Sequence, residues 1–258
     1  MQPQLHSYHI AKDVVAFSST RKGGVSNGAY GEFNINLWCG DSVEHTTENL
    51  ELLASELGIE KDNIIMPHQV HKTEVRIISN SFFNLSKADR TAYIDGVDAV
   101  VTNLTGVCVG VSTADCIPVL LYDPVRRVSA AIHAGWRGTQ QRIVEKTVEV
   151  MHEQFGCATS DLLAVIGPGI SLKAFEVGQE VYDAFAEADF DMPSISVKKE
   201  KWHIDLPLCN KLQLMQAGVP EKHIQCADIC TYFNHEKYFS ARRLGTNSGR
   251  IYTGILMK

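Results

Sequence analysis

The sequence predicts a mixed α/β or α+β fold in one domain. Short apolar runs rich in β-branched residues alternate with segments of helical periodicity, as expected where strands and helices pack against each other. Gly, Pro and Asp lie between these segments, and the chain contains no low-complexity tract, long linker or obvious repeat. A chain of 258 residues can bury a sizeable core. We therefore treat residues 1–258 as a single domain.

The first half of the chain contains one well-marked helix. Asp41-Ser42 can cap a helix over 43–57, and Gly58 can end it. The apolar face of this helix would consist of Leu50, Leu53, Ala54 and Leu57. Strands are predicted for the apolar or alternating runs at 14–18, 74–78, 99–102 and 107–111.

The second half continues the alternation. Apolar runs predict strands at 117–122, 128–132 and 162–166. One helix is expected over 139–154, and another follows the Asp205 cap, has Pro207 in its first turn and ends at Gly218. Their inward faces would be Val144, Val148, Met151 and Phe155 in the first helix, and Leu208, Leu212 and Met215 in the second. The tail, 237–256, is expected to form strands broken near Gly245 and Gly249.

Charge and composition exclude several classes of partner. The formal net charge is −6, and Lys and Arg are scattered, so neither a nucleic-acid surface nor a membrane-binding surface is expected. The N-terminal segment lacks the apolar run of a secretory signal, and no stretch is long and apolar enough for a membrane span. We expect a cytoplasmic protein whose seven cysteines are mostly reduced. Nothing in the sequence indicates the oligomeric state.

A predicted hairpin brings a cysteine and a histidine together. Asp123-Pro124 lies between the strands 117–122 and 128–132 and favours a type I turn. A two-residue loop would pair Tyr122 with Arg127, and the same register sets Cys116 opposite His133. Side chains so opposed have Cβ atoms about 4.5–5.5 Å apart. They can share a zinc ion, whose bonds to sulfur and nitrogen are about 2.3 and 2.0–2.1 Å.

The spacing leaves alternatives open. Two-residue hairpins prefer mirror-image turns, so a longer loop could shift the register and separate the pair. Cys116 could then be a buried thiol, and His133 a hydrogen-bonded histidine at a strand end. Spacing does not identify a third ligand, for which His68 and His71 are the candidates. Arg137, just before the predicted helix, could hold a phosphate or carboxylate.

Several ordered fragments over nearly the whole chain resemble the laccase-domain family, once described as polyphenol oxidases and now as purine nucleoside phosphorylases. The most specific fragments are Thr113-Ala-Asp-Cys-Ile-Pro118 and His133-Ala-Gly-Trp-Arg-Gly138, accompanied by Ser19-Thr-Arg-Lys-Gly-Gly-Val-Ser26, Gln69-Val-His71, Gly167-Pro-Gly-Ile170, Cys230-Thr231 and Arg242-Arg243. The resemblance implies a layered α/β/β/α arrangement around mixed sheets, similar to the catalytic domain of cytotoxic necrotizing factor.

The resemblance also implies a site and a reaction. The family's zinc ligands fall on His71, Cys116 and His133, and copper could replace zinc in vitro. The implied reactions are phosphorolysis of adenosine, inosine, guanosine and methylthioadenosine, and deamination of adenosine. The candidate catalytic residues are Cys116, Asp115 and Arg137, and the candidates for binding nucleoside or phosphate are Arg21, Asn34, Arg137 and Arg243. Glu176 is a candidate for orienting a ligand histidine. The chain departs from the family pattern at Phe175 and Ala241, which could alter the pocket's shape.

Other classes remain open at this stage. A cysteine hydrolase or deamidase would use Cys116 as nucleophile and His133 as base, with the same opposed geometry. A true multicopper oxidase is disfavoured, because it needs many copper-binding histidines and the chain has ten histidines with no His-x-His pair. A non-catalytic binding module is the third alternative.

Overall fold

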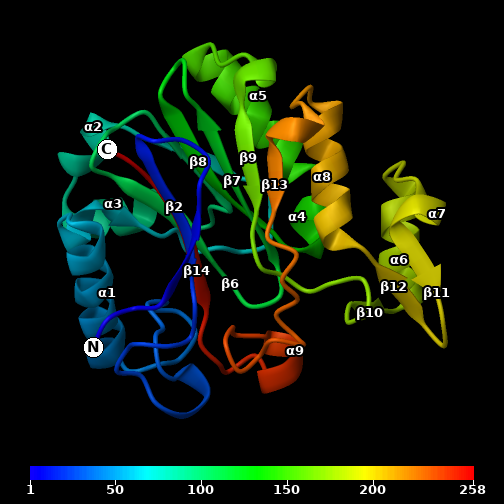
Figure 1. Cartoon of the computed structure of the whole chain (residues 1–258), viewed down its shortest axis with the longest axis horizontal. Coiled ribbons are helices and arrows are strands. Elements are labelled where there is room, and N and C mark those ends of the chain that lie inside the picture. Colours follow the sequence, from blue (N-terminus) through cyan, green and yellow to red (C-terminus); the bar gives the residue numbers. More distant parts are fainter.

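The computed structural model describes all residues, 1–258, and contains two β-sheets packed face to face (Figure 1). Sheet A has the order β1-β2-β14-β6-β3, and its strands are Leu5–Tyr8, Val14–Ser19, Ile251–Met257, Cys108–Thr113 and Ile64–Ile65. Sheet B has the order β13-β9-β7-β8-β5-β4, with strands Ile224–Cys226, Leu163–Ile166, Ile117–Asp123, Val128–Ala134, Ala99–Thr102 and Val75–Ile78. Both sheets contain parallel and antiparallel pairs.

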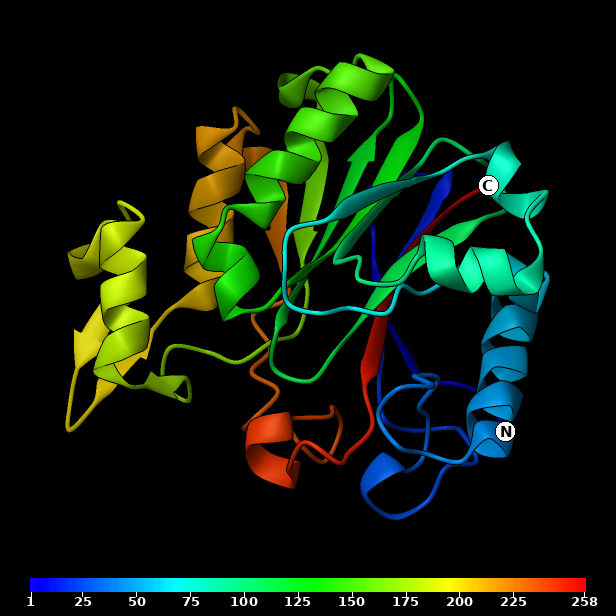
Figure 2. The same ribbon diagram turned by 180° about the vertical axis from the view of Figure 1, so that it is seen from behind.

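Helices cover the outer faces of the two sheets. Helix α1 (Val43–Leu57) packs on sheet A, where Leu53 and Ala54 contact the cluster that contains Phe17 and Tyr252. On sheet B lie α4 (Trp136–Gln140), α5 (Ile143–Phe155) and α8 (Leu206–Gln216), as Figure 2 shows from behind. The predicted α/β/β/α layering is confirmed, while the likeness to cytotoxic necrotizing factor stays a prediction.

Successive side chains along a strand point alternately into the core between the two sheets and into the core on the sheet's outer face. Val109 and Val111 of β6 and Leu120 and Ala131 of sheet B belong to the inner cluster. Their neighbours Val119 and Ile132 belong to the cluster beneath the sheet B helices. This alternation follows from the two-residue period of a strand. Residues of the same parity at the strand ends therefore point into the gap between the sheets.

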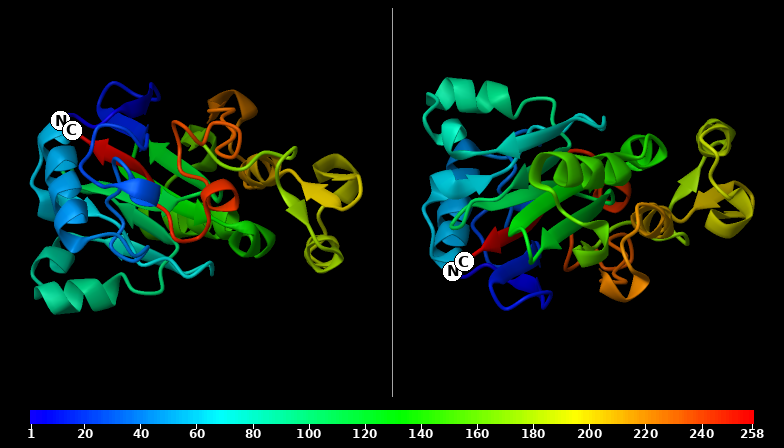
Figure 3. Two further views of the ribbon diagram at one scale, coloured as in Figure 1. Left: turned by 90° about the horizontal axis from the view of Figure 1, so that it is seen from below. Right: turned by 90° about the horizontal axis from the view of Figure 1, so that it is seen from above.

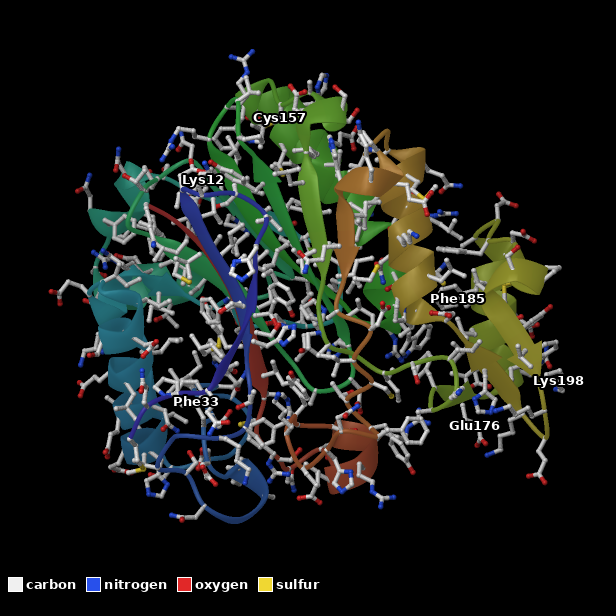
Figure 4. The ribbon with its side chains drawn as sticks, viewed as in Figure 1. Lys12, Phe33, Cys157, Glu176, Phe185 and Lys198 are labelled. Carbon is white, nitrogen blue, oxygen red and sulfur yellow. The ribbon has the colours of Figure 1, made fainter.

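A small lobe projects beside the start of α8 (Figures 1 and 3). It contains β10 (Glu176–Val177), α6 (Gln179–Glu187), α7 (Met192–Ile195), β11 (Ser196–Lys198) and β12 (Trp202–Ile204), and its three strands form a separate sheet. Phe185 is fully buried there and packs on Phe190. Figure 4 labels Glu176, Phe185 and Lys198 in this lobe.

The remaining elements are short. Helices α2 (Asn80–Phe83) and α3 (Lys87–Tyr93) lie between β4 and β5, and α9 (Ala241–Leu244) precedes β14. Single 3-10 turns span Gly28–Tyr30, Lys61–Asn63, Thr159–Asp161 and Glu221–His223. None of the helices combines the length and apolar character needed to cross a bilayer.

The predicted hairpin exists, but its register was predicted wrongly. Tyr122 pairs with Ser129 and Asp123 with Val128, so the loop has four residues rather than two. The Asp123 carboxylate accepts the backbone N–H groups of Val125 and Arg126, which closes this longer loop. The error is two residues along the partner strand, and a shift of two keeps each side chain on its face. Cys116 is therefore diagonal to His133 instead of directly opposite.

Three helical predictions also need correction. The segment predicted as one helix over 139–154 contains α4 and α5, separated at Arg142, whose φ is 66°. In α8 the buried residues are Leu206, Cys209, Asn210, Gln213 and Leu214. Of the predicted face, Leu208 and Leu212 are half-buried against the same core, while Met215 is 39% exposed and was predicted wrongly. The tail contains α9 before its single strand β14, whereas strands alone had been predicted. Helix α1, its Ser42 cap and its end at Gly58 are confirmed.

Candidate metal centre

His71, Cys116 and His133 lie together at one end of the gap between the sheets. Their ligand atoms are all within 4.8 Å of one another. Cys116 directly precedes β7 and has the parity of Leu120, and His133 near the end of β8 has the parity of Ala131. Both side chains therefore face sheet A. The diagonal register is sufficient to bring the sulfur and the imidazole to one point.

The loop between β3 and β4 supplies the third member of the cluster. This loop crosses from sheet A to sheet B, and its His71 has a φ of 61°, a sparsely populated conformation for a side-chain-bearing residue. Gln69 fixes the loop to β6, because its Nε2 donates to the Ser112 carbonyl at 2.8 Å and its Oε1 accepts the Ser112 N–H at 2.7 Å. These bonds keep the loop in place and so hold His71 in its strained backbone conformation.

Asp98 organises two of the three candidate ligands. Its Oδ1 lies 2.7 Å from Nδ1 of His133 and accepts the backbone N–H of His71 at 2.9 Å. Its Oδ2 accepts the N–H groups of Val70 and Lys72. A carboxylate on Nδ1 leaves Nε2 of His133 available as a metal ligand and fixes the ring's orientation. Burial favours a higher pKa for Asp98, but the bond and the charge of His133 lower it.

Sequence reasoning missed Asp98. The only signal was an aspartate directly before a strand that was predicted to be buried. The residue considered for this role, Glu176, instead pairs with Lys201 at 3.0 Å in the projecting lobe (Figure 4). Glu176 therefore does not orient a histidine of the cluster.

The electrostatics of the cluster favour a thiolate. Burial favours the neutral form of Cys116, but His133 and His71 hold the pKa of the thiol well below its ordinary value. Burial likewise opposes the charged form of His133, but Cys116 and Asp98 raise its pKa. Thiolate sulfur and imidazole nitrogen are the donors that zinc prefers.

A glycine makes room beside these donors. A Cβ at Gly135 would lie 2.9 Å from Cδ2 of His71 and 3.2 Å from Sγ of Cys116. Only a residue without a side chain leaves the two ligands in place. The donor set and the space around it fit a zinc ion held by His71, Cys116 and His133.

The cluster opens into a cavity of about 280 Å³. Residues from several loops, from the end of β6 and from the start of α9 form its walls, among them Asn36, Trp38, Cys39, His68, Gln69, Ser112, Thr113, Ala114, Ala241, Thr246 and Arg250. Ala241, one of the two departures from the family pattern, is among them. Phe175, the other departure, is buried beneath the guanidinium of Arg242 and does not line this cavity.

The structure places Asp115 beside the cluster as a bridge between loops. Its φ is 90°, Oδ1 accepts the Thr231 hydroxyl at 2.6 Å, and Oδ2 accepts the Arg242 N–H at 2.7 Å. Its backbone carbonyl accepts the N–H of Ile170. These bonds hold the turn that presents Cys116.

The four predicted substrate-binding residues do not line the cavity. Arg21 donates to the carbonyls of Gly31 and His235, and Asn34 is buried with its amide on Asp41. Arg137 and Arg243 are exposed. Their roles in binding substrate stay predictions. The arginine that does line the cavity is Arg250, which the sequence reasoning did not single out.

A second, larger cavity of about 490 Å³ lies between the ends of β9 and β13 and the start of α8. Cys226 and Cys230 line it, and none of the three candidate metal ligands does.

The chain is similar to several known proteins over most of its length. The model of the family described as "Multi-copper polyphenol oxidoreductase laccase" matches residues 15–258. A Bacteroides thetaiotaomicron protein named purine nucleoside phosphorylase is 45% identical over 93% of this chain and 90% of its own length. A protein named adenosine deaminase RL5, from an unknown prokaryotic organism, is 41% identical over 99% of both chains.

Solved structures have the same fold. The Bacillus licheniformis protein YfiH is 26% identical and superposes with a TM-score of 0.93 over 99% of this chain and 97% of that one. Geobacillus stearothermophilus YlmD is 28% identical, with a TM-score of 0.90 over 97% of this chain and 94% of that one. The matched family model and these relatives show that the chain belongs to the laccase-domain family.

Proposed function

We propose that this chain is a zinc-dependent purine nucleoside phosphorylase that acts on adenosine, inosine, guanosine and methylthioadenosine and can also deaminate adenosine. The observation that carries the proposal is the His71–Cys116–His133 cluster at the base of a cavity. It is supported by the 45% identity to a protein named purine nucleoside phosphorylase and the 41% identity to one named adenosine deaminase.

Phosphorolysis requires the protein to position two reactants, the nucleoside and phosphate. Phosphate forms a bond to the anomeric carbon of the ribose, the C–N glycosidic bond breaks, and its electron pair leaves on the purine, which takes up a proton. The products are the free base and the sugar 1-phosphate, which is ribose 1-phosphate for adenosine, inosine and guanosine and 5-methylthioribose 1-phosphate for methylthioadenosine. A zinc ion held by His71, Cys116 and His133 would supply a Lewis acid at this site.

The chain's own residues supply binding and orientation in this proposal. Asp98 holds His133, and Asp115 holds the turn of Cys116. Arg250 is the cavity's cation, and it is positioned by bonds from its guanidinium to the carbonyls of Thr246, Ser248 and Gly249. We assign the phosphate to the neighbourhood of Arg250, because a fixed guanidinium suits an oxyanion.

Chromatography of inosine and adenosine incubated with the protein, with and without phosphate, tests the reaction class. We expect phosphate-dependent release of hypoxanthine and adenine, and a loss of at least about 100-fold in Cys116→Ala, since removing a ligand removes the metal. Cys226→Ser, a cysteine outside the cluster, is the matched control and should retain activity. Absence of phosphate-dependent base release would contradict phosphorolysis.

Metal analysis of the same preparations distinguishes the alternatives. One zinc per chain is expected in the wild type and in Cys226→Ser, and much less in Cys116→Ala. Copper in its place would favour the oxidase chemistry in the family's description. Full activity without metal would favour a hydrolase that uses Cys116 as nucleophile.

A further inference from the structure

The cavity beside the metal centre contains a buried hydroxyl with no partner. Thr113, the last residue of β6, is 1% exposed, and its Oγ1 makes no hydrogen bond. The neighbouring hydroxyl of Ser112 accepts a bond from Asn36 at 2.6 Å. Buried hydroxyl groups in proteins almost always have a partner, because leaving one unpaired costs free energy. Since Thr113 lines the cavity, a ligand there can supply that partner.

The side chain of Thr113 faces the same gap between the sheets as the candidate metal ligands. Thr113 has the parity of Val109 and Val111, so its side chain faces the gap between the sheets, where Cys116 and His133 also point. Thr113 ends β6, and Cys116 follows three residues later, at the end of the connection to β7. A group bonded to Thr113 therefore lies on the metal side of the cavity.

A different wall of the cavity is aromatic. The rings of Trp38 and His68 stack with centroids 5.0 Å apart and an interplanar angle of 28°. His68 is fixed by Asp95, whose Oδ1 lies 2.6 Å from its Nδ1. Trp38 is 39% exposed, so part of the indole remains accessible. Flat heterocycles bind to such surfaces by stacking.

We propose that Thr113 binds a ribose hydroxyl and that the Trp38–His68 wall stacks on the purine, so that Thr113 determines the enzyme's specificity for the sugar. The inference rests on the proposed function and adds the orientation of the substrate. A ribose hydroxyl both donates and accepts, which matches a threonine hydroxyl free to rotate. The orientation places the anomeric carbon, which joins sugar to base, between Thr113 and the aromatic wall.

Thr113→Val tests the sugar contact, because valine keeps the shape and removes the hydroxyl. The substrates are inosine and its 2′-, 3′- and 5′-deoxy analogues. We expect kcat/KM of the variant for inosine to fall about 10- to 100-fold, the range for loss of a hydrogen bond at a polar site. The fall should disappear with the one analogue that lacks the contacted hydroxyl. Thr113→Ser should restore the wild-type pattern.

Controls separate this role from a structural one. Thr147→Val removes a buried hydroxyl that donates to Ile143 within α5, and it should leave all four substrates unaffected. An equal fall for every analogue in Thr113→Val, or no fall at all, overturns the inference. Zinc content and Tm of each variant show whether the site and fold are intact.

Binding measurements test the sugar contact separately from the proposed reaction. Dissociation constants of the same nucleosides, measured by calorimetry, should show the same analogue-dependent loss in Thr113→Val. If that pattern holds and no base is released, phosphorolysis fails while the sugar contact stands. If base is released and the pattern is absent, the reaction stands and the sugar contact fails.

The aromatic wall has its own readout. Nucleoside binding should quench the fluorescence of Trp38, and the quenching should disappear in Trp38→Phe while KM rises less than about threefold, because phenylalanine still stacks. Trp38→Ala should raise KM about tenfold or more with a smaller effect on kcat. Unchanged KM in Trp38→Ala would overturn the assignment of the base to this wall.

Discussion

The carboxylate of Asp98 joins segments that are far apart in sequence. It accepts backbone N–H groups of the His71 loop and lies against Nδ1 of His133. The side chain is fully buried. One residue that does not line the cavity thus fixes both the backbone of one candidate ligand and the ring of another.

Asp98→Asn should weaken metal binding. An amide places N–H donors where backbone N–H groups or Nδ1 of His133 need an acceptor, so we expect zinc affinity to fall about 10- to 100-fold. Competition with a chromophoric chelator measures this affinity. Asp95→Asn, which alters an exposed carboxylate on the non-ligand His68, is the control and should bind zinc normally. Equal affinities for wild type and Asp98→Asn would contradict the role given to Asp98.

Gly135→Ala should damage the centre without unfolding the protein. The backbone at Gly135 has φ −68° and ψ 169°, which alanine adopts readily. Its methyl group would instead press on His71 and Cys116. We expect at least about tenfold weaker zinc binding, as for disturbed ligand geometry. The check is zinc stoichiometry after dialysis, with circular dichroism as the test of fold. Stoichiometric zinc after dialysis would refute the steric argument.

The candidate site was predictable from the sequence only in part. The hairpin put Cys116 and His133 on one face, because strand parity survives a two-residue error in register. His71 came from the family resemblance, since no local spacing connects it to them. Asp98 and Thr113 could not be assigned, because their significance depends on which distant groups do or do not meet them.

At the level of elements, α8 shows how buried polar residues can make a prediction from hydrophobic periodicity wrong. Asn210 and Gln213 are buried because their amides bond Thr139 of α4. The buried face therefore includes two polar residues, and Met215 faces outward. Hydrophobic periodicity, which counts only apolar residues, included Met215 in the inward face and left out these two polar residues.

Neighbouring residues of α8 give a direct test. Leu214 is fully buried and Met215 is 39% exposed. Leu214→Ala should lower the free energy of unfolding by about 2–5 kcal/mol, because it removes contacts and leaves a cavity. Met215→Ala should change it by no more than about 0.5 kcal/mol. Urea denaturation measures both. Comparable losses in the two variants would restore the face predicted from the sequence.

Most strands and α1 were predicted because each carries its own signal. The central strands β7 and β8 of sheet B are largely apolar runs, and α1 has Ser42 as cap and Gly58 as stop. Helix α9 has four residues and no buried member, so periodicity could not reveal it. The break between α4 and α5 depends on Arg142 adopting a positive φ, for which its residue type gives no signal.

For the whole molecule, the candidate metal centre connects the two sheets. His71 lies on the loop that leaves sheet A at β3 and enters sheet B at β4, and Cys116 and His133 belong to the β7–β8 hairpin. Their assembly requires that both sheets are already packed together. Residue patterns alone predicted the strands but not this packing, because it depends on contacts between distant segments. The layering of the two sheets came from the family resemblance.

Metal removal should therefore destabilise the whole fold. At zinc concentrations about 1,000-fold above Kd, binding to the native state contributes about 4 kcal/mol. For a chain of this size, we expect chelation to lower Tm by about 10 °C. Differential scanning calorimetry with a chelator, and then with zinc restored, measures the shift. Cys116→Ala should show no such shift. A wild-type Tm that is insensitive to chelation would contradict a zinc ion bound at this position.

The place of β14 in sheet A governs when the molecule can be completed during synthesis. β14 follows every other element in the chain, yet it lies between β2 and β6 and pairs with both. Until β14 has left the ribosome, β2 and β6 each have an open edge. β6 carries Thr113, so the wall of the cavity is finished only with the last strand. A nascent chain arrested before Ile251 would therefore expose two strand edges and lack a completed site.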